Sequence, residues 1–390
     1  MTIEPRPLRI VDFSTHLSGP LASHLLTELG ADVVKVENPR TGDGNRGNVP
    51  LIRGSGMMHV ALNAGARSLA VDRRADDWDQ TIAACASWAD AVLVGARPKD
   101  ARKRGMDFET MIKANPELIY VSLSGFGDQG PWKDYTAHGQ TIDALAGLVP
   151  VADGELQPTT RSGWRTAGTS LGGVFAALGV LAAARRRDQG LGEPQYLSVS
   201  LWGAAMWWNW RDLTMLANTG EPWFDYSDIG SRYSLYYTRD RRVMLCAPTE
   251  RRFWLSFCDI LGLPESWKER GDWSGSMENG EGPEFANERA GIAAAMATKD
   301  LDDWVPLLEA AEIPFAPVLG IGDALASQHS VENGVMRPTT LAGEPAQIPA
   351  IPIKFGSAPE DQILSHLSAP PSIGEHTDEM RRELGLGGGA

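Results

Sequence analysis

The chain has 390 residues, 43% of them hydrophobic and 22% charged, and its formal net charge is −14 at pH 7. These values are typical of a globular protein long enough for two domains, and they exclude a disordered or fibrous chain. The acidic balance argues against nucleic acid or an anionic membrane as the main partner, and no apolar run approaches the roughly 20 residues of a membrane span.

Strand and helix signals alternate over the first third of the chain. Short apolar runs predict strands at residues 8–13, 32–37, 67–72, 91–95 and 118–124. Helices are expected from the Gly19-Pro20 pair to Gly30, at residues 77–88, and at residues 108–113. This alternation predicts an α/β protein with a mostly parallel sheet that is covered on both faces.

The pattern becomes helical from Ser170. Apolar residues recur at three- and four-residue steps from Leu171 to Ala182, with Thr169 or Ser170 available as a cap and three arginines at residues 185–187 for the last turn. A second apolar helix, at residues 201–217, carries four tryptophans, at positions 202, 207, 208 and 210. These tryptophans could line a bulky acyl pocket, although core or interface packing is the more common role.

The middle of the chain differs in style. Runs at residues 234–238 and 243–248 predict a hairpin, helices are expected at residues 253–261 and 301–313, and the polar segment 269–287 favours a solvated loop. We therefore expect a large domain from residues 1–218, a small domain at 219–318, and a return to the large domain at 319–390. No signal peptide is visible, and three cysteines without metal or redox spacing favour a reduced, cytoplasmic protein with no metal site.

The stretch SGFGDQGPW, residues 124–132, contains the spacing G-x-G-x-x-G directly after an apolar run. A dinucleotide-binding turn would need a following helix and an acidic residue about 20 positions further on. Here Pro131 and Trp132 follow at once, and the next residues are polar and turn-like. The stretch is therefore interpreted as a glycine-rich loop.

Several long blocks of the sequence resemble the class III CoA-transferase family, which includes formyl-CoA transferases, carnitine CoA-transferases and α-methylacyl-CoA racemases. The blocks are residues 19–47, 61–74, 89–134, 252–263, 313–336 and 370–385, and SGFGDQGP itself is similar to the family's SGFGQxGP loop beside the CoA site. The resemblance implies a Rossmann-like large domain built from both chain ends, a smaller α+β middle domain, and two interlocked chains. It also implies acyl-CoA and a small carboxylic acid as substrates, with no covalently bound cofactor, no nucleic acid and no membrane.

The resemblance also implies a set of CoA-contacting residues. They are Leu17, Ser18, Asp72, Arg73, Arg74, Gly95, Ala96, Arg97, Lys103, Arg104 and, at the position of a racemase histidine, His138. Most of these residues follow the expected strands, where ligands of such sheets usually bind, and the arginines and lysines suit the phosphates of CoA. The alternative interpretation of these arginines and lysines is a solvated basic face that binds no ligand. Asn38 departs from the arginine that several relatives place near the adenine.

The family's transferases use an aspartate nucleophile just before the long apolar helix, in a pattern such as G-D-x-x-x-G. A carboxylate suits acyl exchange because its acyl adduct is close in energy to a thioester. Aligning on Gly172 places Gly168, which has no side chain, at the nucleophile position. Asp153, Glu155 and Asp188 lie too far along the chain to replace it, and Asp134 and Asp143 are expected to be structural.

His138 does not replace the missing aspartate, because racemisation pairs that histidine with the same aspartate. Three hypotheses remain. The chain is the aspartate-lacking subunit of a CoA-transferase whose sister chain carries the nucleophile; or it works alone as an acyl-CoA enzyme, racemase-like or deprived of its nucleophile by engineering; or it is a non-catalytic CoA-binding or scaffold protein. A homodimer or a heterodimer with an aspartate-bearing paralogue is expected.

Overall fold

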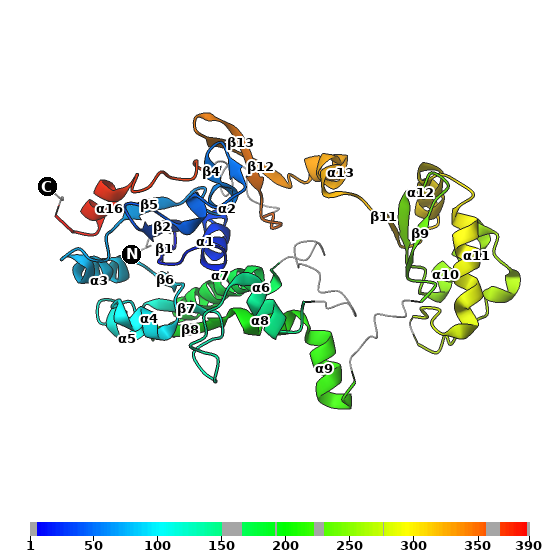
Figure 1. Cartoon of the computed structure of the whole chain (residues 1–390), viewed down its shortest axis with the longest axis horizontal. Helices are drawn as coiled ribbons and strands as arrows, with labels where there is room; N and C mark the ends of the chain where they lie inside the picture. Colours follow the sequence, from blue (N-terminus) through cyan, green and yellow to red (C-terminus); the bar gives the residue numbers. More distant parts are fainter. Residues whose placement is uncertain are drawn as a thin grey trace. The chain divides into compact units, whose positions relative to one another are not determined.

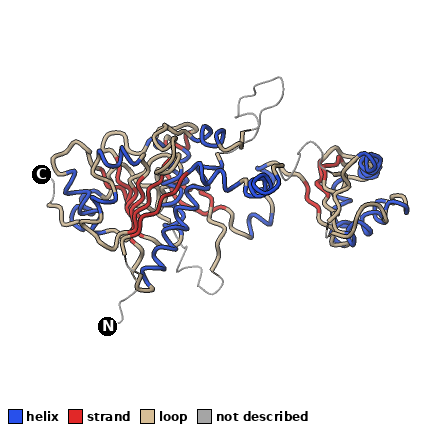
Figure 2. The backbone as a smooth tube through the Cα atoms, turned by 90° about the horizontal axis from the view of Figure 1, so that it is seen from below, coloured by secondary structure: helices blue, strands red, loops and turns tan. Residues whose placement is uncertain are grey.

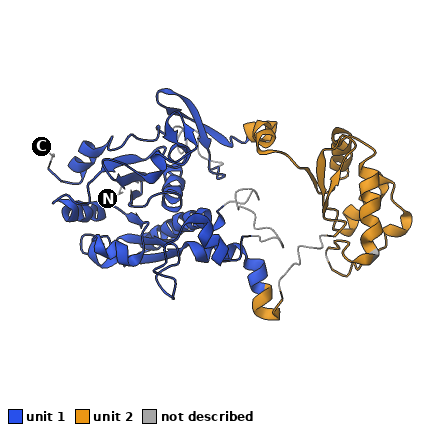
Figure 3. Cartoon of the chain, in the orientation of Figure 1, with its two compact units in different colours: residues 1–214, 333–390 blue, residues 215–332 orange. Residues whose placement is uncertain are grey.

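The computed structural model describes residues 6–149, 166–191, 193–221, 230–275, 277–355 and 367–387. The chain divides into two compact units, one of residues 1–214 and 333–390 and the other of residues 215–332 (Figure 3). The large unit therefore combines both ends of the chain, as predicted. The sequence analysis placed the boundaries after residues 218 and 318, whereas the units divide after residues 214 and 332.

The large unit is built on a six-stranded parallel sheet (Figures 1 and 2). Its strands stand in the order β5-β2-β1-β6-β7-β8. Their bounds are Arg9–Asp12 for β1, Asp32–Glu37 for β2, Arg67–Ala70 for β5, Ala91–Val94 for β6, Ile119–Ser124 for β7 and Gln195–Ser200 for β8. When the strands are numbered by sequence, this is the Rossmann order 3-2-1-4-5-6. Successive strands are added outward on one side of β1 as far as β5, and then on its other side starting with β6, so the strand order reverses between β1 and β6.

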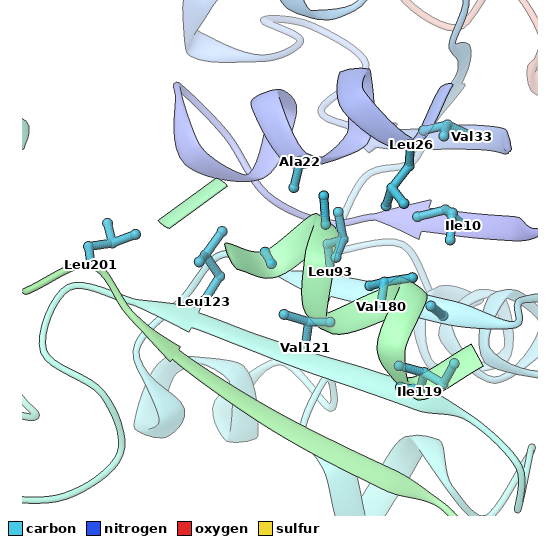
Figure 4. Close-up of a cluster of buried hydrophobic side chains, with 14 of the residues drawn as sticks. Ile10, Ala22, Leu26, Val33, Leu93, Ile119, Val121, Leu123, Val180 and Leu201 are labelled. Atoms are coloured by element: carbon cyan, nitrogen blue, oxygen red, sulfur yellow. The ribbon is translucent and has the colours of Figure 1, made fainter. Parts of the chain in front are cut away.

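Consecutive residues of each strand point to opposite faces of the sheet, where they pack into two separate hydrophobic cores. Ile10 and Leu93 face one side with Ala22 of α1 (Ser18–Glu28) and Val180 of α7 (Ala167–Asp188), as Figure 4 shows. Val11 faces the other side. The elements on that side are α3 (Trp78–Trp88), α4 (Pro98–Lys103), α5 (Phe108–Met111) and α16 (Thr377–Glu383). This alternation makes the expected three-layer arrangement, with helices on both faces.

Helix α7 is the one described helix long and apolar enough to cross a membrane by length and composition. It packs against α1, α8 (Leu201–Trp208) and β7, and 44% of its most apolar window is buried. Those contacts are those of a core helix. The arginines predicted for its last turn, residues 185–187, are found there.

The C-terminal residues return to the large unit at two places. The hairpin of β12 (Met336–Leu341) and β13 (Glu344–Pro349) packs Leu341 and Ile348 on α2 (Met57–Leu62), beside the small hairpin of β3 (Leu51–Ile52) and β4 (Ser55–Gly56). Helix α16 places Met380 in the core over β5. Neither element of the return was predicted as a strand or helix.

The small unit holds the predicted hairpin, β9 (Ser234–Tyr237) and β10 (Val243–Cys246), which pair antiparallel. A third strand, β11 (Phe315–Pro317), adds to β10 and was not predicted, although its residues fall within the expected small domain. The helices of the unit are α10 (Arg251–Leu261), α11 (Ala286–Met296), α12 (Leu301–Ala310), α13 (Ile321–Ala326) and α14 (Gln328–Glu332). Trp254, Phe257 and Trp304 fill its core.

Two helices differ from the expectation. The helix predicted at residues 201–217 is divided into α8 and α9 (Trp210–Thr219). Helix α7 begins at Ala167, so Thr169 and Ser170 lie inside its first turn and are not its cap. The carboxylate of Asp143, from α6 (Gly139–Leu145), takes the capping role and could not be identified from local sequence.

Candidate active site

A cavity of about 510 Å³ lies at the carboxyl edge of the sheet, between the loops that follow the neighbouring strands β1 and β6. The loop after β1 contributes residues 14–18 and the loop after β6 contributes residues 95–97. Leu123 and Leu201, which also belong to the hydrophobic core in Figure 4, line it as well. This is the switch point at which Rossmann-type sheets bind their ligands.

Two further cavities adjoin the first along the same edge. The second, of about 250 Å³, shares Ser14 and Thr15 with the first and is lined by Asn38, Asp72 and several cations. The third, of about 510 Å³, shares Arg73, Arg74, Trp78 and Arg104 with the second and adds Lys103. Cations thus gather at one end of the three cavities.

All the residues that the sequence analysis proposed for CoA contact line one of these cavities. Leu17, Ser18, Gly95, Ala96, Arg97 and His138 line the first cavity, and Asp72, Arg73, Arg74, Lys103 and Arg104 line the other two. Lys99 pairs with Asp134 at 3.1 Å and lines none of these three cavities.

The glycine-rich loop after β7 also borders the first cavity. Ser124 and Gly125 line it, while Gly127 and Gly130 have φ angles of 78° and 82°, the left-handed conformation that glycine adopts without strain. Phe126 packs into the core against Trp132. The loop therefore turns the chain away from the cavity after two residues, and no helix follows it directly.

Gly168 is buried and is not one of the residues that line the first cavity. A Cβ atom at this position would lie 2.7 Å from the carbonyl oxygen of Leu201 and 2.8 Å from Oδ1 of Asp143. Both distances are too short for real carbon contacts, so the backbone packing itself requires glycine here. The position that the sequence analysis assigned to the nucleophile has no room for one.

Thr169, the next residue, lines the cavity, as does Thr166. Thr169 is 7% exposed, and its hydroxyl donates to the carbonyl oxygen of Thr166 at 3.3 Å. The sequence analysis considered Thr169 only as a helix cap, because the register of α7 depends on Asp143, which lies 25 residues away from Gly168.

The carboxylates near the start of α7 do not enter the cavity. Asp143 is fully buried and accepts hydrogen bonds from the amide nitrogens of Ala167 and Gly168 at 2.8 and 2.9 Å. Burial raises the pKa of Asp143, and the two amide hydrogen bonds oppose that rise. Asp188 is at the far end of α7, and Asp153 and Glu155 lie outside the described residues. Within the described part of the chain, no Asp or Glu lines this cavity.

A buried ion cluster fixes the loop after β1. The Lys35 ammonium lies 3.1 Å from Oδ2 of Asp12 and 2.9 Å from Oδ2 of Asp43, and it donates to the carbonyl oxygen of Ser14 at 2.8 Å. Burial disfavours the charged amine, but the two carboxylates outweigh it and raise the pKa of Lys35. The cluster joins the loops after β1 and β2 into one rigid rim.

A second network, centred on Arg46, stabilises the loop after β2 through an ion pair and hydrogen bonds. Arg46, at the end of the 3-10 turn Gly44–Arg46, pairs with Glu37 and donates to the carbonyl oxygen of Pro371 at 2.9 Å. Its guanidinium also lies 3.1 Å from Nε2 of His59. Burial and then the Arg46 charge lower the pKa of His59 to about 4.

The fold and the cavities thus define an α/β protein with a Rossmann-type sheet and a cation-rich ligand edge. The sequence profile described as CoA-transferase family III matches residues 6–377. The chain therefore belongs to CoA-transferase family III, which confirms the resemblance stated above.

Curated relatives are similar to this chain over almost its whole length. The acetyl-CoA:oxalate CoA-transferase of Acetobacter aceti is 26% identical, covering 97% of this chain and 95% of the relative. The succinyl-CoA:mesaconate CoA-transferase of Haloarcula hispanica is 27% identical, over 98% and 96%. The β subunit of the succinyl-CoA–L-malate CoA-transferase of Chloroflexus aurantiacus is 23% identical, over 97% and 93%.

Solved structures share the fold. A Mycobacterium tuberculosis protein matches with a TM-score of 0.79 at 23% identity, covering 96% of this chain and 98% of its own. A CAIB/BAIF family protein of Brucella suis matches with a TM-score of 0.76 at 22% identity, over 97% and 98%. The α/β fold expected from the sequence is thereby confirmed.

Proposed function

We propose that this protein binds acyl-CoA along the three cavities and acts as the aspartate-lacking subunit of a hetero-oligomeric CoA-transferase. The observation that carries the proposal is the composition of the first cavity. It is lined by histidine, threonine, serine and asparagine side chains and, among the residues described, by no carboxylate. The described lining residues therefore offer no carboxylate nucleophile for acyl exchange through a mixed anhydride.

The charge distribution supports one orientation of the ligand. Arg73, Arg74 and Arg104, with Lys103 beside them, suit the phosphates of CoA, and Asp72 lies among them. The thioester end would then lie in the first cavity, beside Leu17, Ser18, Gly95, Ala96, Arg97 and His138. The substrates would be an acyl-CoA thioester and a small carboxylic acid.

The residues at the start of α7 provide no carboxylate nucleophile, so a partner chain would have to supply it. Gly168 has no space for a side chain, and the threonine beside it ends in a hydroxyl, whose acyl ester is a poorer donor than an anhydride. A sister chain with an aspartate at the start of its long helix would supply the missing nucleophile. One relative is itself named as a β subunit, which is consistent with such an assembly in this family.

An exposed apolar surface supports association with another chain. Leu178 and Val174 of α7 are 58% and 44% exposed, and Trp207 and Trp208 of the neighbouring α8 are 54% and 57% exposed. Large exposed apolar patches usually mark protein interfaces. The tryptophans of α8 do not line the first cavity, so an interface suits them better than an acyl pocket. Interlocking of the two chains remains a prediction.

The reducing compartment also remains a proposal. Cys85, Cys246 and Cys258 are all buried and unpaired. Burial raises the pKa of each of these thiols to about 12, so they behave as apolar core residues. This is consistent with a cytoplasmic protein.

The test combines capture and reconstitution. The tagged chain is isolated from its native cells, the co-purifying proteins are identified, and CoA transfer from acyl-CoA to carboxylic acids is measured with and without them. We expect acyl-CoA binding by the chain alone, transfer only by the complex, and a homologous partner with aspartate at the start of its long helix. Transfer by the isolated chain, or the absence of any aspartate-bearing homologue, would contradict the proposal. Binding without turnover in every combination would instead support a non-catalytic CoA-binding protein.

A further inference from the structure

The first cavity differs in charge from the two cavities beside it. Several cations line the second and third cavities, among them Arg40, Arg73, Arg74, Lys103 and Arg104. Of the described residues that line the first cavity, Arg97 is the one arginine or lysine, and none is an aspartate or a glutamate. Its other ionisable lining residues are His16, Tyr135 and His138. The cations thus lie where the phosphates of CoA are proposed to bind, and the proposed acyl end has one.

The charge of Arg97 already has a partner. Its Nε donates a hydrogen bond to the carboxylate of Asp100 at 2.6 Å. Its Nη1 donates to the carbonyl oxygen of Asp134 at 3.1 Å and to the hydroxyl of Thr136 at 3.3 Å. The hydrogen bond from Arg97 lowers the pKa of Asp100, which keeps that carboxylate charged. Arg97 therefore holds the loop before α6, and a carboxylate on a ligand would have to compete with Asp100 for it.

The helix termini at the cavity do not replace a cation. The amides of Ala167 and Gly168, at the start of α7, already donate to the carboxylate of Asp143. Helix α1 begins at Ser18 without a side-chain cap, and Pro20 in its first turn has no amide hydrogen. Because a helix terminus carries about half an elementary charge, the start of α1 provides less than an arginine or a lysine would.

Much of the remaining wall is apolar. Its large apolar lining residues are Leu17, Met58, Leu123, Ile142 and Leu201, of which Leu123 and Leu201 are labelled in Figure 4. Burying a charge among such side chains is costly unless the charge is paired. An acyl group with a carboxylate or an ammonium beyond its thioester therefore meets no unengaged counterion among the described lining residues.

One buried polar group in this wall has no partner. Ser124, the last residue of β7, is 4% exposed and lines the cavity, and its hydroxyl has no hydrogen-bond partner in the part of the chain that is described. Ser122, two residues earlier and equally buried, donates to the carboxylate of Asp128 at 3.2 Å. Because an unpartnered buried hydroxyl is costly, Ser124 is a donor that a ligand in the cavity can satisfy.

We propose that the first cavity selects an acyl group that carries no charge, and that the hydroxyl of Ser124 donates a hydrogen bond to the carbonyl oxygen of its thioester. The proposal rests on the acyl-CoA binding in the proposed function and adds the substrate class. The relatives compared above are named for the dicarboxylic acids oxalate, mesaconate and L-malate. The proposal assigns to this chain the thioester of an uncharged, monocarboxylic acyl group instead.

Pairs of thioesters with acyl groups of similar shape test the charge. Succinyl-CoA ends in a carboxylate where 4-methylpentanoyl-CoA has a branched alkyl group, and β-alanyl-CoA and butyryl-CoA are the corresponding pair for a positive charge. Isothermal titration calorimetry with the full chain is done at pH 8, where an ordinary imidazole is uncharged. We expect each uncharged thioester to bind at least about tenfold more tightly than its charged counterpart. Equal or tighter binding of a charged thioester would overturn the proposal.

A cation added to the cavity should weaken this preference. Met58→Arg replaces an unbranched lining side chain with one that ends in a guanidinium, so we expect the preference for 4-methylpentanoyl-CoA over succinyl-CoA to fall about tenfold. Met57→Arg is the matched control, because residue 57 is 36% exposed and does not line the cavity, and it should leave the preference unchanged. Equal effects of the two variants would overturn the assignment of the acyl group to this cavity.

Ser124→Ala tests the hydrogen bond separately. CoA itself has no thioester carbonyl, so the variant should bind butyryl-CoA about three- to tenfold more weakly and bind CoA as the wild type does. Its stability should not fall, since no described group loses a partner. Ser122→Ala is the matched control and should bind both compounds as the wild type does.

The outcomes separate this proposal from the one on which it rests. An unchanged ratio of butyryl-CoA affinity to CoA affinity in Ser124→Ala would overturn the role of that hydroxyl. A wild-type chain that binds neither CoA nor any thioester would overturn the proposed function together with this proposal. Binding that favours the charged acyl groups would overturn this proposal alone.

Discussion

The amide nitrogen of Gly168 donates a hydrogen bond of 2.9 Å to the buried Oδ1 of Asp143. One carboxylate from α6 thereby caps the first turn of α7, the longest helix beside the sheet, and it also fixes which residues of that turn meet the cavity. The register of α7 at the candidate active site thus depends on this one carboxylate.

Removing the cap should destabilise the large unit. Asp143→Ala is expected to lower the free energy of unfolding by about 1–2 kcal/mol, because two buried amide groups lose their acceptor. Asp143→Asn keeps one acceptor oxygen and should cost less. Urea denaturation followed by circular dichroism measures both, and equal stability of the alanine variant and wild type would show that the cap is dispensable.

Aspartate at residue 169 should create the missing nucleophile. Thr169 lines the cavity in the first turn of α7, where the helix dipole stabilises a carboxylate. Thr169→Asp is therefore expected to release free CoA from propionyl-CoA and to form a covalent adduct that intact-protein mass spectrometry detects, at a rate at least tenfold above the wild-type chain.

Gly168→Asp is the contrasting variant. Its Cβ would overlap the carbonyl oxygen of Leu201, and its charge would face Asp143, so we expect lost stability and no adduct. An adduct in Gly168→Asp but not in Thr169→Asp would show that the position assigned from the sequence is the functional one after all.

Arg74 should contribute to CoA affinity through charge. Arg74→Ala is expected to weaken CoA binding about tenfold and to reduce the sensitivity of binding to salt, because a phosphate partner is lost. Arg185→Ala is the matched control, since Arg185 lies in the last turn of α7, at the opposite edge of the sheet. Isothermal titration calorimetry at two salt concentrations measures both, and equal losses in the two variants would exclude a specific phosphate site.

A charge on the apolar face of α7 should disrupt association. Leu178→Glu places a carboxylate on the exposed apolar face of α7, and we expect a shift to slower sedimentation or loss of the co-purifying chain. Val331, which is 72% exposed on α14 of the small unit, supplies the control Val331→Glu. Unchanged sedimentation of Leu178→Glu at all concentrations would remove this face as an interface.

The buried His59 should make the large unit sensitive to acid. Its pKa in the folded chain is about 4, below the ordinary 6.5, so between these pH values the unfolded chain binds more protons and stability falls as pH falls. The shift corresponds to at most about 3–4 kcal/mol, at roughly 1.4 kcal/mol per pKa unit. His59→Gln should flatten the stability profile from pH 6.5 to 4, relative to His329→Gln. An identical slope in both variants would assign the acid sensitivity to other groups.

Local patterns identified most of the sheet but not the last details of the site. The strands at residues 91–94 and 119–124 are fully buried, so apolar runs revealed them, whereas β8 alternates half-buried and exposed residues in the sequence QYLSVS and was missed. The residues proposed for CoA contact were inferred through a family resemblance, and they line cavities along one edge of the sheet. Thr169 and His16 were not identified, because one depends on a distant carboxylate and the other on a backbone angle that no neighbouring residue dictates.

The division of the large unit between the two ends of the chain has a consequence for synthesis on the ribosome. The hairpin that covers Val60 and the helix that brings Met380 to the sheet emerge only after the whole small unit has been translated. The small unit is continuous in sequence and can fold while it is still tethered, but these apolar surfaces of the large unit stay uncovered until the segment after residue 332 has emerged. Nascent chains that stop before residue 333 should accordingly be the species that chaperones hold.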